Sequence, residues 1–465
     1  MIANANPACV GHLAEVRERS ANSIAPCAVP VHSHNTAATL GLHESTPAVA
    51  EATRSERKFR LLAISSDTFP PTRVDVAVLF GEELAGRGHR IDWLLQSEVQ
   101  CERSYVTSWA GGRVWVGAAN RRPSLLSRLH KHFASIWNDA KVFSLLKGDS
   151  YDAVEVKDKF ISGVLALGAA RLHGKRFIYW LSYPFPEEYL LRAVDGSARF
   201  PLSLLYRIRG NAFSFLLYRM LLQAADHVFV QSDEMRRDLA SKGVPLARLT
   251  AVPMGFKPQL AVPAATQLEV IPPNVPSVLY LGSLSMGRRL DFLLRVMGRI
   301  AREIPEARLY LVGKAEAAAD EEYLRQETVR LGIQSSVVFV GQLPQPEALR
   351  YVQAAHVCVS PLYPTPVFNV ASPTKLIEYM ALGKAVVANT QPEQQMLIEE
   401  SGGGYCVPYE EDAFAAAILQ LLRAPHLARV MGDRGRRYAL QHRNYRTIAD
   451  GVERTMMEIV AGVPR

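Results

Sequence analysis

The fold is decided by the stretch Ser372-Pro373-Thr374-Lys375-Leu376-Ile377-Glu378-Tyr379-Met380-Ala381-Leu382-Gly383, which an apolar run at 385–388 follows. Ser372 is a residue type that caps helices and Pro373 suits a first helical position, so a helix is expected to begin here. Its free amides and the positive end of its dipole form an anion site. Nucleotides usually bind between a strand end and a helix start in α/β sheets, so this segment is a candidate nucleotide site.

The same residues fit two interpretations. In the first, the amides and Lys375 bind a diphosphate, while Glu378, three residues further along the same helix face, binds sugar or ribose hydroxyls. In the second, an ordinary capped helix turns its lysine and glutamate toward solvent. The segment alone leaves both interpretations open.

Predicted strands alternate with predicted helices along most of the chain. The first set of strands is 59–65, 91–95, 153–156, 177–180 and 227–230, and the second set is 278–281, 309–312, 337–340, 357–359 and 385–388. Helical patterns at 412–422 and 445–460 close the chain. This alternation is typical of parallel, doubly wound α/β sheets.

The length of 465 residues indicates two domains with additional segments. Residues 1–57 lack apolar periodicity and are predicted to be disordered. A first Rossmann-like, acceptor-binding domain is expected at 58–258 and a Pro-rich linker at 259–277. The second Rossmann-like domain, which would bind the nucleotide-sugar, is expected at 278–465 together with its closing helices.

Composition points to a cytoplasmic protein. The five cysteines show no paired or metal-ligand spacing, which is typical of a reducing compartment. No stretch approaches the roughly 18 apolar residues of a membrane span, and residues 1–20 lack the apolar core of a signal peptide. We therefore expect a cytoplasmic location, with peripheral attachment to the inner face of a membrane as a further option.

The net charge of +8 is concentrated in residues 1–258, which hold 32 Lys and Arg against 24 Asp and Glu. No nucleic-acid-binding module accompanies this surplus, so no nucleic acid partner is expected. An anionic membrane surface or a phosphate-bearing acceptor fits better. Two basic amphipathic stretches, 121–137 and 204–222, are candidates for such a surface, and core-facing helices with solvated arginines are the alternative.

Together with Ser372–Gly383, three further segments follow a known family pattern in order along the chain. They are Ala225-Asp226-His227-Val228-Phe229-Val230-Gln231-Ser232, Val252-Pro253-Met254-Gly255, and Tyr280-Leu281-Gly282-Ser283 leading to Arg288. The chain thus resembles the family-4 (group 1) retaining glycosyltransferases, more strongly in its C-terminal half. The resemblance implies the GT-B fold, two Rossmann-like domains facing across a cleft. It also implies a nucleoside-diphosphate sugar as co-substrate, with no metal or other cofactor.

The resemblance also implies roles for individual residues. Arg288 and Lys375 match the two cations that clamp the diphosphate and are the expected catalytic residues. Glu378 matches the glutamate that holds the ribose hydroxyls, and Gly282 allows close approach of the backbone to the ligand. The full set of expected donor-binding residues is Gly282, Ser372, Thr374, Lys375 and Glu378.

The chain departs from the family pattern at two places. Val370 stands where a glutamate normally contacts the donor sugar, and the histidine that often follows the 177–180 strand is missing. The expected residues on the acceptor side are therefore Arg73, as a phosphate ligand, and Ser182, Tyr183 and Glu187. A purely structural role is the alternative for each of them, and no metal ligands are expected.

These observations predict a metal-independent glycosyltransferase that acts on a glycan or a lipid-linked glycan, as in surface polysaccharide biosynthesis. Two alternatives remain at this point. One is a degenerate nucleotide-sugar-binding subunit without transfer activity, which the two departures favour. The other is a sugar-nucleotide epimerase built on the same fold, although no convincing acid/base set is present.

Overall fold

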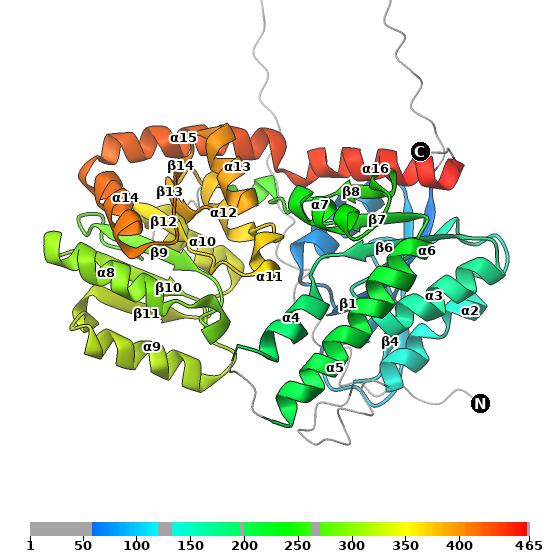
Figure 1. The fold of residues 1–465 in the computed structure, drawn as a ribbon. Coiled ribbons are helices and arrows are strands. Elements are labelled where there is room, and N and C mark those ends of the chain that lie inside the picture. The colour runs from blue at the N-terminus through cyan, green and yellow to red at the C-terminus, as the bar shows by residue number, and fades with distance from the viewer. Residues whose placement is uncertain (1–57, 120–132, 196–199, 262–269, 463–465) are drawn as a thin grey trace, which may run out of the picture. The chain divides into compact units, whose positions relative to one another are not determined.

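The computed structural model describes residues 58–119, 133–195, 200–261 and 270–462. It contains two β-sheets, each flanked by helices (Figure 1). Three sequence predictions fall wholly or partly outside the described residues. They are the disordered segment 1–57, the basic residues 121–131, and residues 262–269 of the Pro-rich linker. The domain boundaries stay predictions.

The first sheet has eight strands in the order β3-β4-β2-β1-β5-β6-β7-β8. Its strands are β1 (Arg60–Phe69), β2 (Arg90–Ser97), β3 (Tyr105–Trp109), β4 (Gly112–Gly117), β5 (Ala153–Lys157), β6 (Arg176–Leu181), β7 (His227–Val230) and β8 (Leu249–Ala251). All neighbours pair in parallel except β3 and β4, which form an antiparallel hairpin at one edge. The parallel strands confirm the predicted alternation, whereas the hairpin and β8 were not predicted.

The second sheet has six strands, all parallel, in the order β11-β10-β9-β12-β13-β14. Its strands are β9 (Ser277–Leu281), β10 (Arg308–Val312), β11 (Val337–Gly341), β12 (Val357–Ser360), β13 (Val386–Asn389) and β14 (Gly404–Val407). In a doubly wound sheet the strand order reverses beside the first strand, here between β9 and β12. The loops that leave β9 and β12 therefore lie side by side at the carboxyl edge.

Helices connect the strands in both halves (Figure 1). In the first half they are η2 (Asp75–Leu84), α2 (Val142–Leu145), α3 (Phe160–Leu172), α4 (Phe185–Arg192), α5 (Leu202–Ser214), η3 (Phe215–Leu221), α6 (Leu222–Ala224), α7 (Asp233–Ser241), η4 (Leu246–Arg248) and η5 (Pro258–Ala261). In the second half they are η6 (Met286–Arg288), α8 (Asp291–Glu303), α9 (Ala318–Arg330), η7 (Gln334–Ser336), α10 (Gln345–Ala354), α11 (Pro366–Asn369), α12 (Thr374–Ala381), α13 (Pro392–Ser401), α14 (Glu411–Arg423), α15 (Pro425–His442) and α16 (Tyr445–Ala461). None of the described helices is long and apolar enough to cross a bilayer.

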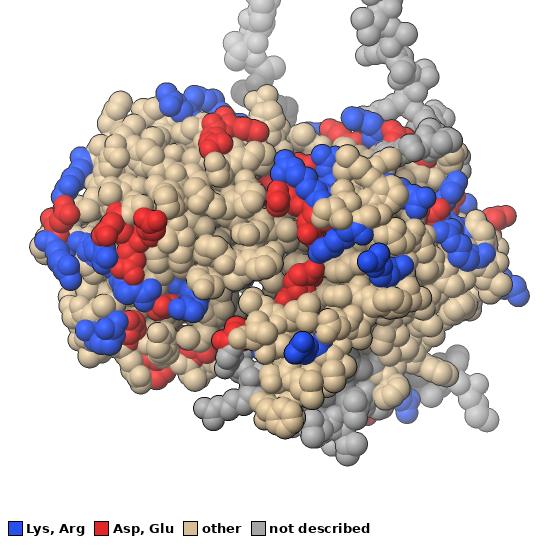
Figure 2. Space-filling model, viewed as in Figure 1, with Lys and Arg blue, Asp and Glu red and all other residues tan. Residues whose placement is uncertain are grey.

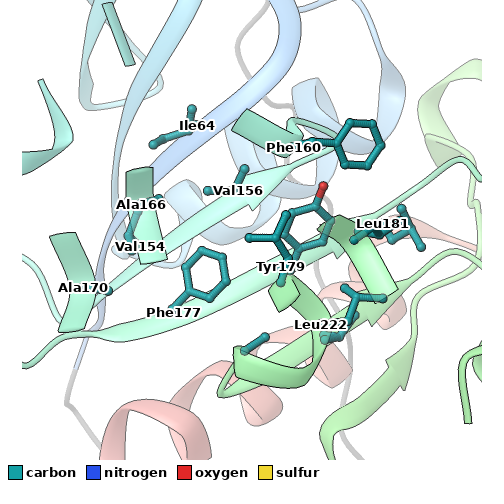
Figure 3. Packing of buried hydrophobic residues seen from close by; sticks show 14 of the residues in the cluster. Ile64, Val154, Val156, Phe160, Ala166, Ala170, Phe177, Tyr179, Leu181 and Leu222 are labelled. Carbon is teal, nitrogen blue, oxygen red and sulfur yellow. The ribbon is translucent and has the colours of Figure 1, made fainter. Parts of the chain in front are cut away.

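Each sheet is buried on both faces, and successive residues of a strand enter different core layers because strand side chains alternate. In β1, Leu62 and Ile64 face the layer under α3 and η3, whereas Leu61 and Ala63 face the layer under η2. Tyr179 of β6 lies in the middle of the first layer (Figure 3). The apolar runs in the sequence are long because both faces need apolar side chains.

The last helix, α16, completes the core of the first sheet. It packs against η2, and Tyr445 near its start is fully buried among side chains of the first sheet. Arg87 holds it from the surface through ion pairs with Asp450 at 2.8 Å and Glu453 at 2.7 Å. The predicted closing helix at 445–460 therefore exists, and the apolar layer that it closes belongs to the first sheet.

Candidate active site

Helix α12 begins at Thr374, and the expected cap by Ser372 is wrong. Pro373 is the N-cap residue, and no side chain accepts a hydrogen bond from the first-turn amides. The Ser372 hydroxyl is buried elsewhere, where it accepts from the Met254 amide at 3.0 Å and donates to Glu393 at 3.4 Å. Because no side chain caps it, the helix N-terminus keeps the free amides that an anion requires.

Lys375, the second residue of α12, turns its ammonium toward the loop that follows β9. The Nζ atom lies 3.9 Å from the centre of the Tyr280 ring. Gly282, the first residue after β9, has a φ of +146°, and a Cβ atom at this position would lie 3.1 Å from the Lys375 Nζ atom. A side chain at Gly282 would therefore both strain the backbone and crowd the lysine. The structure brings Gly282 and Lys375 together, as the donor-site prediction requires.

The environment of Lys375 disfavours its own positive charge. Burial, together with the nearby charge of Arg288, holds the pKa of the Lys375 ammonium well below its usual 10.5, and Glu378 opposes this shift. Such a lysine is short of a compensating anion. A diphosphate placed beside it would supply that anion and favour the charged form.

Arg288 ends η6 in the same loop. Its guanidinium carbon lies 4.9 Å from the centre of the Phe368 ring on α11. Stacking on an aromatic ring orients a guanidinium while leaving its N–H groups free to fork onto phosphate oxygens. The neighbouring Arg289 is directed differently, with φ of +51° and its guanidinium over Tyr363. Of the two arginines, Arg288 is the one whose charge acts on Lys375.

Glu378 lies one turn along α12 from Lys375. Its Oε1 atom accepts a hydrogen bond from Gln345 Nε2 at 3.0 Å. Burial raises the pKa of the Glu378 carboxyl, and Gln345 and Lys375 oppose this shift. Gln345, at the start of α10, was not identified from the sequence, because nothing local to residue 345 shows that α10 begins beside α12.

Val370, which replaces the family glutamate, is part of the contact between the two halves of the chain. Its side chain is buried in the apolar layer of the first sheet. Its carbonyl accepts a hydrogen bond of 2.6 Å from Ser232 Oγ, the residue that also caps α7. The position that normally supplies a carboxylate to the donor sugar is thus used for packing.

On the acceptor side, the structure brings Arg73 and Ser182 together. Arg73 donates to Ser182 Oγ at 3.2 Å, but it also forms an ion pair with Asp75 at 3.1 Å. Asp67 at 3.6 Å and Asp158 at 3.9 Å complete a ring of carboxylates around the guanidinium. An acceptor phosphate would have to compete with these groups, so the surroundings of Arg73 suit an acceptor hydroxyl better than a phosphate.

The ring of carboxylates continues into a buried ion pair. Lys157 at the end of β5 donates to Asp75 at 2.5 Å. Although burial acts in the opposite direction, the charges of Lys157 and Arg73 hold the pKa of the Asp75 carboxyl below its usual value. Asp158, the next residue, has φ of +56° and accepts from the Ser182 amide at 2.9 Å. Sequence reasoning missed these residues, although charged residues directly after a buried strand are a usable signal.

Tyr183 and Glu187 are placed differently from each other. Burial raises the pKa of the Tyr183 hydroxyl, Glu188 beside it adds to the shift, and the charge of Arg288 opposes it. The hydroxyl is therefore close enough to Arg288 for the two groups to interact electrostatically. Glu187 instead accepts from the Tyr218 hydroxyl at 2.7 Å and pairs with Lys242 at 2.8 Å. The structure thus ties Glu187 into the packing of the first half.

Two family profiles match the chain. Residues 75–255 match the glycosyl transferase 4-like domain, and residues 275–424 match the glycosyl transferases group 1. The chain belongs to the group 1 glycosyl transferases. Both matches follow the order of the two sheets, and the second includes every residue of the candidate donor site. Among the described residues of this group 1 protein, no group of three or more His, Cys, Asp or Glu side chains is arranged to hold a metal ion.

Curated relatives of this group 1 protein share about a quarter of its residues over part of the chain. A D-inositol 3-phosphate glycosyltransferase of Catenulispora acidiphila is 26% identical over 225 residues, which cover 46% of this chain and 52% of that protein. An alpha-monoglucosyldiacylglycerol synthase of Streptococcus pneumoniae is 23% identical over 294 residues, covering 61% and 62% respectively. The chain spans about half the length of the first curated relatives that it matches.

Solved structures confirm the GT-B fold. A sucrose-phosphate synthase from Thermosynechococcus elongatus superposes with a TM-score of 0.67 at 23% identity, covering 87% of this chain and 100% of that one. Anabaena HepE in complex with UDP-glucose superposes with a TM-score of 0.61 at 17% identity, covering 86% and 99%. The predicted pair of doubly wound domains is therefore correct.

Proposed function

We propose that the chain transfers a sugar, with retention, from a nucleoside-diphosphate sugar to an acceptor hydroxyl. One observation carries the proposal: Arg288 and Lys375 converge at the uncapped N-terminus of α12, beside Gly282. As the anomeric bond breaks, negative charge grows on the departing diphosphate. Cations and amides that are already in place stabilise that charge most strongly in the transition state.

The same arrangement supports a metal-independent reaction. The two side chains and the helix N-terminus supply the positive charge that a divalent cation supplies in other transferases. Donor binding and transfer should then continue in the presence of a chelator. A donor affinity that disappears with the chelator and returns with added Mg²⁺ would contradict this part of the proposal.

The acceptor that we propose is a glycan or a lipid-linked glycan at the cytoplasmic face of a membrane, as in surface polysaccharide biosynthesis. The names of two relatives include a lipid, namely the phosphatidyl-myo-inositol mannosyltransferase of Mycolicibacterium smegmatis and the alpha-monoglucosyldiacylglycerol synthase of Streptococcus pneumoniae. HepE of Anabaena has been solved in complex with UDP and glucose, so UDP-glucose is the first donor to test. The carboxylates around Arg73 support an uncharged hydroxyl region of the acceptor.

The decisive experiment has two stages. Thermal unfolding with a panel of nucleoside-diphosphate sugars identifies the donor, because a ligand that binds only the folded state raises the midpoint. Release of the free nucleotide from that donor, with and without a mixture of lipid-linked acceptors, then measures turnover. We expect release that the acceptors accelerate.

The packing of Val370 favours one alternative, a nucleotide-sugar-binding subunit without transfer activity, since it removes the carboxylate that contacts the donor sugar. Such a protein would show the thermal shift and release no nucleotide under any condition. An epimerase would instead convert the donor into a second nucleotide-sugar, which chromatography of the reaction mixture would separate. Either result would contradict the proposed transfer activity and support the corresponding alternative.

A further inference from the structure

The outer surface of α5 and η3 is apolar where a soluble helix is normally polar. Leu204, Ile208 and Phe215 are 47%, 58% and 63% exposed. Their spacing of four and seven residues places them in one row along the helix, on the side away from the protein. Arg207 directly precedes Ile208 and Arg219 follows Phe215 by four residues, and both arginines are exposed, so cations accompany the row. This arrangement is typical of a helix that lies in a membrane interface.

The charged residues of α5, η3 and the residues just before α5 are all positive. Residues 200–222 contain the exposed arginines Arg207, Arg209 and Arg219 and no Asp or Glu. Phe200, Leu202 and Leu205 add exposed apolar side chains at the start of α5. Figure 2 shows the surface over α5 as mostly tan with isolated blue side chains. A contiguous apolar surface with cations alone usually marks an interaction site.

The opposite side of α5 already satisfies the packing of the helix. A Cβ atom at Gly210 would lie 2.8 Å from Leu190, so α5 and α4 are in close contact there. The rings of Tyr206 and Tyr189 stack with centroids 6.2 Å apart, and Arg209 lies over the Tyr189 ring at 4.5 Å. The outward row is therefore not needed to hold the helix in place.

We propose that this outer face of α5 and η3 binds the surface of a bilayer that contains anionic phospholipid. The apolar row would enter the boundary between headgroups and acyl chains, and Arg207 and Arg219 would contact lipid phosphates. A second copy of the chain is a poorer occupant. A symmetric contact through this face would bring arginines against arginines with no carboxylate between them.

The position of the face suits an acceptor that is held in a membrane. Helix α4, on which α5 packs, begins two residues after Tyr183 and three after Ser182, the candidate acceptor-side residues. A bound bilayer would therefore lie one helix away from the acceptor side. The proposal does not depend on the transfer reaction, because vesicle binding is measured without donor or acceptor.

Flotation with phosphatidylcholine vesicles, with and without phosphatidylglycerol, tests the proposal. The wild-type protein should float with the mixed vesicles at low salt and detach as salt rises, since screening shortens the reach of the charges to about 8 Å at ~0.15 M. The variant Leu204→Ser/Ile208→Ser/Phe215→Ser should lose at least about tenfold in vesicle affinity. The variant Arg207→Gln/Arg219→Gln should lose about fivefold per arginine on mixed vesicles and little on phosphatidylcholine alone.

A matched control changes exposed residues of the second half. Val329 is 60% exposed and Arg302 is exposed, so Val329→Ser/Arg302→Gln should float like the wild type. Circular dichroism shows whether each variant is folded. If the triple-serine variant is unfolded, the vesicle affinity of the arginine variant tests the proposal instead. Wild-type protein that stays in solution with mixed vesicles at low salt would overturn the proposal. The proposal would also be overturned if ultracentrifugation showed that the wild type is a dimer, that vesicles leave this dimer intact, and that the triple-serine variant is a monomer.

Discussion

The ammonium of Lys375 lies 3.9 Å from the centre of the Tyr280 ring, so a charged group at the start of α12 rests on the strand end of β9. The aromatic face partly replaces the water that the ammonium loses. It does not replace all of it, since the pKa of Lys375 remains well below its usual value. The lysine is therefore held ready for an anion at some cost to the unliganded protein.

The first prediction concerns the two cations. Arg288→Ala and Lys375→Ala should each reduce turnover by about 30- to 1000-fold, since a lost contact to developing charge costs roughly 2 to 4 kcal/mol of transition-state stabilisation. The urea unfolding midpoint of Lys375→Ala should not decrease, because the folded protein disfavours this charge. Arg302→Ala, on the exposed side of α8, serves as the control and should retain full turnover. Near wild-type turnover in both site variants would place the donor elsewhere.

The second prediction follows from the lowered pKa of Lys375. Above that pKa the free protein carries a neutral amine, whereas a bound diphosphate favours the ammonium, so binding should take up a proton. Nucleotide affinity should then fall as pH rises through the pKa of the free lysine. Calorimetry in buffers of different ionisation enthalpy measures the proton uptake directly. Lys375→Arg, whose guanidinium stays charged, should bind without it. Proton exchange that is equal in wild type and Lys375→Arg would assign the uptake to another group.

The third prediction separates Glu378 from Gln345. Glu378→Ala should weaken donor binding by about 10- to 150-fold, because hydrogen bonds to a charged group contribute roughly 1.5 to 3 kcal/mol. Gln345→Ala removes only the 3.0 Å bond that orients the carboxylate, and about 2- to 12-fold is expected. In the double variant the Gln345 effect should vanish, since its partner is absent. Strictly additive losses would show that Gln345 acts independently of Glu378.

The fourth prediction concerns Glu155, a fully buried residue of β5. Burial raises the pKa of its carboxyl from 4.5 to about 8. Between these values the unfolded chain has released the proton while the folded protein keeps it, so the stability of the folded state falls as pH rises. The decrease reaches at most about 1.4 kcal/mol per pH unit.

Urea unfolding of wild type and Glu155→Gln at pH 5 and pH 8 checks this prediction. Glutamine is nearly the same size and does not titrate, so the variant should lose less stability than the wild type over this interval. Other titrating groups are common to both proteins and cancel in the comparison. Parallel pH dependences would mean that Glu155 is ionised in the folded protein.

Much of the fold follows from local sequence. Strand β7 was predicted with its observed bounds, because four buried residues between turn residues leave little choice of structure. The motif at 372–383 likewise placed Lys375 and Glu378 on one face of a helix, since three residues nearly complete a turn. These features depend on residues that are neighbours in the chain, so the local sequence pattern is enough to predict them.

Tertiary structure decided the partners of these groups. The Ser372 hydroxyl turns to the Met254 amide rather than to its own helix, and Gln345 reaches Glu378 from another helix. Lys157 meets Asp75 because β5 pairs beside β1, an order that no local pattern encodes. Helix periodicity and strand alternation act over a few residues. Which side chains meet at the sheet edge depends on how the strands are ordered across the whole domain.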